Sequence, residues 1–238
     1  MGVLKFEEYL REEAREWDVV GTTDLSFPGA AIKEETWKQF YNEPPKKIIF
    51  RGDLASHIAI VVRGNDGRWW FAEMVGTKHQ VRYRNLVTGA LLDPGDYVYI
   101  HPEKQEKWQK VTIKSGLVLT DPQKYNHKHP FKHVVFIGRL KELDNADLRC
   151  DMNEWVFTAY KIGKQYDYPG LLEYPKWLSW TQVQDRPDWW YCSEMPRHGF
   201  ERFGIPYPES WKEKVSPMDH QLWDRYEMVY KMDVRRGV

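Results

Sequence analysis

Cysteine is scarce in this chain of 238 residues, which contains only Cys150 and Cys192. Small disulfide-stabilised domains use more cysteines at closer spacing, and structural zinc sites use cysteines in close pairs. Neither pattern occurs here. We therefore expect a reducing compartment and at least one free thiol, with a single bridge between the two cysteines as the alternative.

Long apolar runs and an excess of charge of one sign are also lacking. No stretch approaches the about 20 apolar residues of a membrane span, and the acidic, amphipathic N-terminus lacks the apolar core of a signal peptide. Lys plus Arg and Asp plus Glu number 35 each, so the net charge of zero gives no reason to expect nucleic acid as a partner. We expect no transmembrane segment and a cytoplasmic protein, unless it is released or phage-associated. The oligomeric state stays open.

Motifs for cofactors are missing as well. The sequence has no phosphate-binding glycine loop, no dinucleotide-binding glycine pattern and no HExxH motif. A histidine-rich stretch without such partners is better interpreted as loop residues than as a zinc site: His127, His129 and His133. Three aspartates lack the glycine and the terminal glutamate of a calcium loop: Asp144, Asp147 and Asp151. The sequence predicts neither a metal nor another cofactor.

Apolar and aromatic residues, in contrast, are abundant. Hydrophobic residues make up 42% of the chain, with 12 Trp, 14 Tyr and 10 Phe. This content can fill a large core and excludes a disordered chain. The length suits one domain, and no repeat or linker divides it. We expect a single domain over residues 1–238.

The clearest β pattern is a hairpin. A β-branched run at 58–62 suits a strand buried on both faces, the Asn-Asp-Gly sequence at 65–67 is typical of a tight turn, and the return strand covers 69–75. Further strands are expected at 79–87, 96–101, 108–119 and 133–138. Together they predict an α+β fold with an antiparallel, barrel-like sheet.

Helices are predicted from apolar spacing and from the residues at their ends. The expected helices cover 4–17, 34–41, 152–163 with Gly163 as C-cap, Cys192 to Phe203, and at least one surface helix within 209–236. Two stretches are predicted to be irregular: 18–33 and the aromatic-rich loop 164–190. We expect the sheet to pack against the helix that begins near Cys192.

Cys192 is the candidate nucleophile. It follows an aromatic run and lies at a predicted helix start, where free N–H groups and the helix dipole stabilise a thiolate and later an oxyanion. The alternative is a buried structural cysteine, which is the more common role of this residue type.

His57 and Glu73 are its candidate partners. His57 is the only histidine inside a strongly β-like apolar run, and it is either a core residue or a base that faces a cleft. Across the predicted hairpin, Glu73 lies near residue 58. There it can orient the imidazole as the third member of a triad, or it is a solvated rim residue.

Four segments resemble, in their order, the circularly permuted branch of the NlpC-like, papain-fold cysteine hydrolases, which includes YiiX-type proteins and relatives of lecithin retinol acyltransferase. They are the His strand at 56–62, the Phe-Ala-Glu sequence at 71–73, a G-x-x-Y-D segment at 163–167 and the Cys-Ser-Glu sequence at 192–194. In this branch the His strand precedes the Cys helix. The resemblance covers about 48–205; the stretch 77–150 does not align, and Pro196 fits only in the first turn of the helix.

The resemblance implies a papain-like thiol hydrolase in which Cys192 attacks a carbonyl, His57 is the base and Glu73 fixes its tautomer. It also implies oxyanion or substrate-binding roles for tyrosines, a residue type that more often packs: Tyr166, Tyr168 and Tyr191. The implied substrate is an amide bond in peptidoglycan peptides. The alternatives are an acyl-lipid ester, for hydrolysis or acyl transfer, and a non-catalytic structural or binding module.

Overall fold

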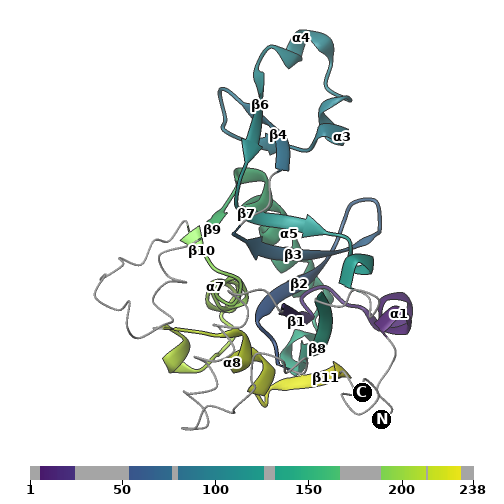
Figure 1. Cartoon of the computed structure of the whole chain (residues 1–238), viewed down its shortest axis with the longest axis vertical. Helices are drawn as coiled ribbons and strands as arrows, with labels where there is room; N and C mark the ends of the chain where they lie inside the picture. Colours follow the sequence, from purple (N-terminus) through teal and green to yellow (C-terminus); the bar gives the residue numbers. More distant parts are fainter. Residues whose placement is uncertain are drawn as a thin grey trace.

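The computed structural model describes residues 6–24, 54–76, 80–125, 132–166, 189–212 and 214–231. In this part of the chain, the largest sheet has six strands in the order β11-β8-β1-β2-β3-β7 (Figure 1). The strands are β1 (Val19–Asp24), β2 (His57–Arg63), β3 (Trp69–Val75), β7 (Gly116–Thr120), β8 (Lys132–Leu140) and β11 (Tyr226–Lys231). All neighbouring pairs are antiparallel, which confirms the predicted α+β class.

β2 and β3 form the hairpin that the sequence predicts. Residues 58–62 are buried without interruption, as expected for a central strand with both faces covered. Gly67 adopts a φ of 76° in the turn, a conformation that favours glycine. Ala59 lies opposite Glu73, and because side chains alternate along a strand, His57 and Glu73 share one face of the sheet.

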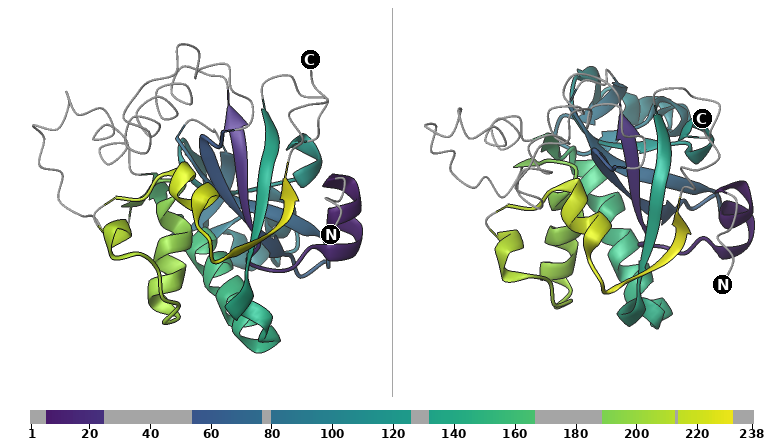
Figure 2. Two further views of the ribbon diagram at one scale, coloured as in Figure 1. Left: turned by 90° about the horizontal axis from the view of Figure 1, so that it is seen from below. Right: turned by 60° about the horizontal axis from the view of Figure 1, so that its bottom comes forward.

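Two hydrophobic clusters cover the two faces of this sheet and take alternate residues of β2. One packs against α5 (Ala146–Ile162) and α7 (Glu194–Arg202) and includes Cys192. The other packs against α1 (Phe6–Glu8) and the π-helix Tyr9–Glu13. Figure 2 shows these helices on opposite sides of the sheet. Cys192 thus belongs to the cluster on the side of α5 and α7.

A smaller sheet projects from the main one at the top of Figure 1. Its strands are β4 (Gln80–Asn85), β5 (Leu91–Leu92) and β6 (Trp108–Ile113), and the connection from β5 to β6 contains α3 (Pro94–Tyr97) and α4 (Pro102–Gln105). The buried Arg82 attaches it to α5, because its guanidinium stacks on the Tyr160 ring at 3.9 Å and donates to the Tyr160 carbonyl at 3.1 Å.

Two predictions in this region are wrong. The strand expected at 96–101 is replaced by α3, whose first helical position is Pro94, a residue pre-set for a helix start. The single strand expected at 108–119 is two strands in different sheets, because the chain turns between β6 and β7 and Gly116 adopts a φ of 129°. The strands expected at 79–87 and 133–138 are confirmed as β4 and β8.

The prediction of an irregular stretch at 18–33 is wrong for residues 19–24, which form β1 between β2 and β8. Gly21 within this strand serves close packing. A Cβ at this position would lie 1.9 Å from a ring carbon of Phe136, so only glycine lets the strand approach that ring. Residues 25–33 lie outside the described residues.

The helical predictions hold in part. α5 is six residues longer at its start than expected, because Asn145 caps it by accepting from the N–H groups of residues 147 and 148. Gly163 is confirmed as the C-cap, with a φ of 74°. The N-terminal helix ends at Glu13 rather than at residue 17, and the chain turns at Trp17, whose φ is 68°. The helix expected at 34–41 lies outside the described residues.

The C-terminal region is more buried than predicted. It contains the 3-10 helix Glu209–Lys212, α8 (Pro217–Leu222) and β11, which pairs with β8 as an additional strand of the main sheet. Its buried side chains include Trp211, Met218, His220 and Tyr226. The expectation of a surface helix is therefore wrong for this segment, because its aromatic residues complete the core.

Candidate active site

The turn that carries Cys192 is shaped by the residues around it. The N–H of Tyr191 donates to the Glu194 carboxylate at 3.1 Å, and the N–H of Glu194 donates to the Tyr191 carbonyl at 3.2 Å. α7 begins at Glu194, directly after this turn, and Pro196 lies in its first turn. The expected helix start at or just after Cys192 is confirmed.

His57 and Glu73 meet on neighbouring strands. His57 is the first residue of β2, and its side chain is 19% exposed. Its Nε2 lies 2.9 Å from Oε2 of the buried Glu73. The Glu73 carboxylate also accepts hydrogen bonds from the hydroxyls of Thr120 and Tyr125, the latter at 2.6 Å. Donors on both oxygens fit an ionised carboxylate, which only accepts.

The Cys192 sulfur lies within hydrogen-bond reach of the His57 ring. Because Nε2 faces Glu73, Nδ1 is the nitrogen left for the sulfur. The backbone N–H of Ile58 and the Ser193 side chain also lower the thiol pKa of Cys192, which is a buried residue. The structure thus brings together three residues that lie far apart in the sequence.

The three groups shift one another's pKa values. Burial raises the thiol pKa of Cys192, but the charge and hydrogen bond of His57, together with the Ile58 N–H and the Ser193 side chain, lower it overall. Burial lowers the pKa of His57, whereas the neighbouring Cys192 and Glu73 raise it to about 10. Burial also raises the pKa of Glu73, and its hydrogen bonds, above all the one with His57, lower it to about 2.

These shifts favour the charged form of each group: the thiolate of Cys192, the imidazolium of His57 and the carboxylate of Glu73. A thiolate is the nucleophilic form of cysteine, and an imidazolium beside it is a proton donor for a leaving group. The buried carboxylate fixes which ring nitrogen faces the sulfur. The dipole and free N–H groups at the start of α7 add favourable interactions with negative charge.

The structure places two of the three candidate tyrosines near this turn. Tyr166, in the short β9 (Gln165–Tyr166), is buried opposite Trp190 of β10 (Trp189–Trp190). The Tyr191 hydroxyl accepts from the N–H of Val215 at 3.3 Å, so it holds the C-terminal segment. Tyr168 lies outside the described residues, as does most of the predicted loop 164–190.

Several residues of the site were not predicted from the sequence. Thr120 lies at the end of β7, and Tyr125 at the end of the 3-10 helix Pro122–Tyr125, where no motif marks either one. The Ser193 hydroxyl donates to the Val215 carbonyl at 3.0 Å, which joins the cysteine turn to the C-terminal segment. Of these residues, only Ser193 had a signal in the sequence, because it directly follows Cys192.

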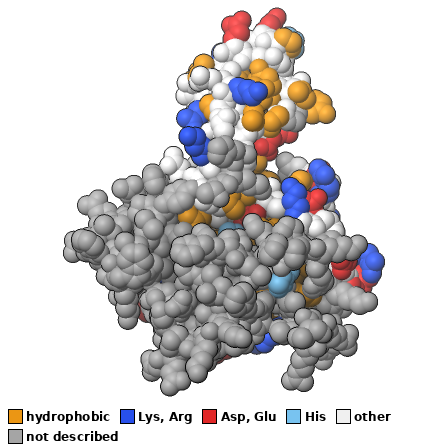
Figure 3. Space-filling view, in the orientation of Figure 1, with side chains coloured by type: hydrophobic (Ala, Val, Ile, Leu, Met, Phe, Trp, Pro, Cys, Tyr) orange, Lys and Arg blue, Asp and Glu red, His pale blue; other side chains and the backbone are white. Residues whose placement is uncertain are grey.

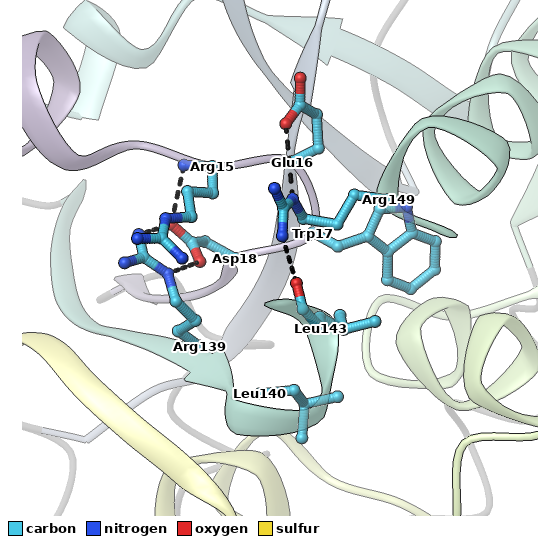
Figure 4. Close-up of a pocket in the computed structure, with 8 residues that line it drawn as sticks. All are labelled: Arg15, Glu16, Trp17, Asp18, Arg139, Leu140, Leu143 and Arg149. Atoms are coloured by element: carbon cyan, nitrogen blue, oxygen red, sulfur yellow. Dashed lines mark hydrogen bonds and ion pairs between the residues drawn. The ribbon is translucent and has the colours of Figure 1, made fainter. Parts of the chain in front are cut away.

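A second cluster of charged residues lies under the N-terminal segment (Figure 4). Arg139 pairs with Asp18 at 2.8 Å, and Asp18 also accepts from the Tyr9 hydroxyl at 2.6 Å. Arg149 lies 3.9 Å from Glu16. The space between these side chains is too narrow for a water molecule, so the cluster ties the segment to β8 and α5 rather than forming a ligand site.

Within the described ranges, no group of three or more His, Cys, Asp or Glu side chains is placed to hold a metal ion. His133 lies on β8 opposite Thr23, and His127 and His129 fall outside these ranges. Both cysteines are free, Cys150 exposed and Cys192 buried. None of the helices in the described part of the chain is long and apolar enough to span a membrane.

Compared with known proteins, the sequence matches no family model and no curated relative. An α+β architecture by itself is compatible with many activities. The function therefore has to be argued from the chemistry of Cys192, His57 and Glu73.

Proposed function

We propose that this protein is a thiol hydrolase that cleaves an amide bond through an acyl-enzyme on Cys192. The contact of a buried thiol with an imidazole that is itself held by a buried carboxylate carries this proposal. A purely structural cysteine needs neither partner. Burying three ionisable groups together is costly unless they interact, and such clusters are common at active sites.

Acylation begins with attack of the Cys192 thiolate on the carbonyl carbon, which forms a C–S bond and an oxyanion. The backbone N–H of Cys192 contributes to the stabilisation of this oxyanion. When the intermediate collapses, the C–N bond breaks and the His57 imidazolium protonates the leaving amine. The thioester and a neutral imidazole remain.

Deacylation uses the same residues in reverse. Neutral His57 takes a proton from a water molecule as its oxygen attacks the thioester carbonyl. The C–S bond then breaks, the acid product leaves, and the thiolate–imidazolium pair is restored. Throughout both steps Glu73 keeps the ring oriented and stabilises its positive charge.

The proposed fold is a circularly permuted papain-like domain of the NlpC type. In support of it, the His strand β2 precedes the Cys192 turn and α7 in the sequence, and Cys192 interacts with His57 at the start of β2. The polar third residue lies on β3, the strand after the histidine, as in the resemblance. The proposed substrate is accordingly a peptide amide of peptidoglycan.

An acyl-lipid ester is a second candidate substrate, and one observation favours it. Large apolar side chains are exposed on the small projecting sheet and its loops, where Figure 3 shows hydrophobic side chains gathered. They include Leu86, Val87, Val98 and Tyr99, which are 61%, 78%, 69% and 88% exposed. Exposed apolar groups of this kind fit contact with lipid chains.

Mass spectrometry of the protein after incubation with peptidoglycan fragments or with short acyl esters tests both candidates. We expect one substrate class to add an acyl mass to the peptide that contains Cys192, with release of product on longer incubation. The matched control is Cys192→Ala, and Cys150→Ala must retain the signal. If neither class gives an adduct or a product and the thiol pKa is ordinary, the protein is a non-catalytic module.

A further inference from the structure

Helix α8 contacts both segments that carry the reacting groups. His220 Nε2 lies 2.9 Å from the carbonyl oxygen of Ser193, the residue after Cys192. On the next residue of the same helix, Gln221 Oε1 accepts the N–H of Ala55 at 2.9 Å. Ala55 leads directly into β2 and His57. Adjacent side chains of α8 thus hold the cysteine turn and the histidine strand.

The His220 contact has a defined protonation state. The ring is fully buried, and burial lowers its pKa to about 4, so it is neutral at physiological pH. A carbonyl oxygen only accepts, which requires the proton on Nε2. Nδ1 then accepts from the hydroxyl of Tyr226 at 3.0 Å. With both nitrogens satisfied, the ring is fixed between β11 and the cysteine turn.

Other contacts hold α8 itself in place. Ser216 and Asp219 form a capping box at its start, in which the Ser216 hydroxyl accepts the N–H of Asp219 and the Asp219 carboxylate accepts the N–H of Ser216. The buried Met218 packs against Leu54, next to Ala55. A six-residue helix would not be stable alone, so these contacts make it a rigid spacer.

We propose that α8 is the positioning element of the active site and that His220 and Gln221 set the separation of Cys192 and His57. The inference rests on the proposed function and extends it to two residues that do not touch substrate. Its physical basis is that thiolate stabilisation by an imidazolium falls steeply with distance in a buried site. Loosening either contact should therefore raise the thiol pKa of Cys192.

The thiol pKa can be measured from the ultraviolet absorbance of the thiolate as a function of pH, as the difference between each variant and its Cys192→Ser partner. This readout does not require a reagent to reach the buried sulfur. We expect His220→Leu to move the midpoint upward by about one pH unit or more. His220→Gln keeps an N–H donor near the position of Nε2, so its thiol pKa should lie close to that of the native protein.

Gln221→Leu is the second test, because it removes the partly buried hydrogen bond from the N–H of Ala55. We expect a smaller upward shift in the same direction. Asn145→Ala is the matched control: it removes the cap of α5 and lowers stability, but it touches neither segment of the site. Its thiol titration should coincide with that of the native protein.

The outcomes separate this proposal from the function on which it rests. If the native thiol titrates with an ordinary pKa, the proposed function fails. If the native pKa is low but both the His220→Leu and Gln221→Leu profiles coincide with it, the function stands and α8 has no positioning role. Equal shifts in Asn145→Ala and His220→Leu would mean that global loosening, rather than these contacts, sets the pKa.

Discussion

Replacing Glu73 by glutamine tests the electrostatic basis of the site, because it removes one negative charge with little change of shape. Glu73 lies 2.9 Å from the His57 ring and is buried, so solvent screens their interaction weakly. Without the carboxylate, the imidazolium loses its charged partner, and a neutral ring stabilises the Cys192 thiolate less. The change should therefore raise the thiol pKa.

The scale of this effect follows from the usual strength of a hydrogen bond to a charged group. A hydrogen bond to a charged group contributes about 1.5 to 3 kcal/mol. Each tenfold change in a protonation equilibrium corresponds to about 1.4 kcal/mol. Loss of the Glu73 interaction should therefore move the thiolate titration of Cys192 upward by about one to two pH units.

The assay is the thiolate absorbance titration of Glu73→Gln against Glu73→Gln/Cys192→Ser. Glu103→Gln, which removes a charge from an exposed position on α4, is the matched control and should leave the midpoint unchanged. A midpoint in Glu73→Gln equal to the native one would refute the reasoning, since Glu73 would then have no electrostatic influence on the pair. A downward shift would contradict it more strongly.

The remaining predictions concern stability and reactivity. Glu73 has a folded pKa of about 2, below its ordinary value of about 4.3. It should therefore contribute about 3 kcal/mol to the free energy of unfolding above pH 4.3, and this contribution should be lost as the pH falls toward 2. In urea unfolding, the stability of the native protein should fall more steeply with acid than that of Glu73→Gln. His57 has a raised folded pKa of about 10, so its contribution to the free energy of unfolding should be full below pH 6.5 and should vanish as the pH rises through 10. His57→Gln should flatten this loss of stability at alkaline pH. Gly21→Ala should destabilise the fold by about 1 to 3 kcal/mol in urea unfolding, because its Cβ would overlap the Phe136 ring, and Phe136→Leu should recover part of this loss in the double variant. Iodoacetamide labelling of Cys192 should fall by less than about tenfold for each pH unit below pH 8, because its thiol pKa is lowered, and Cys192→Ala gives the background from Cys150. A full tenfold fall per pH unit would argue against a lowered thiol pKa.

The parts of the fold that the sequence predicts are those encoded locally. The β2–β3 hairpin follows from its β-branched run and from the turn at 65–67, and its register follows from the length of that turn. The same register places Glu73 near His57, so the sequence alone predicts this pairing. The C-cap at Gly163 is local in the same sense, because it depends on one residue with a left-handed backbone.

Elements that depend on distant contacts were missed. β1 has only two β-branched residues before Gly21, and the ring of Phe136, more than a hundred residues away, explains that glycine. The C-terminal region alternates charged and aromatic residues in a way that is typical of a surface helix. Its aromatic side chains instead complete the core, because β11 joins the edge of the sheet beside β8.

The same distinction applies within the site. Cys192, His57 and Glu73 stand out in the sequence because each is an unusual residue for its local pattern, a thiol at a helix start and polar groups in an apolar hairpin. Thr120, Tyr125 and His220 are common residue types in their local sequence patterns. Each reaches the site through a hydrogen bond that exists only in the folded chain. A motif can therefore indicate candidate reactive groups, but the residues that contact them follow from tertiary packing. For this reason His220→Leu, a substitution outside every motif, should perturb the Cys192 thiol in the same direction as Glu73→Gln.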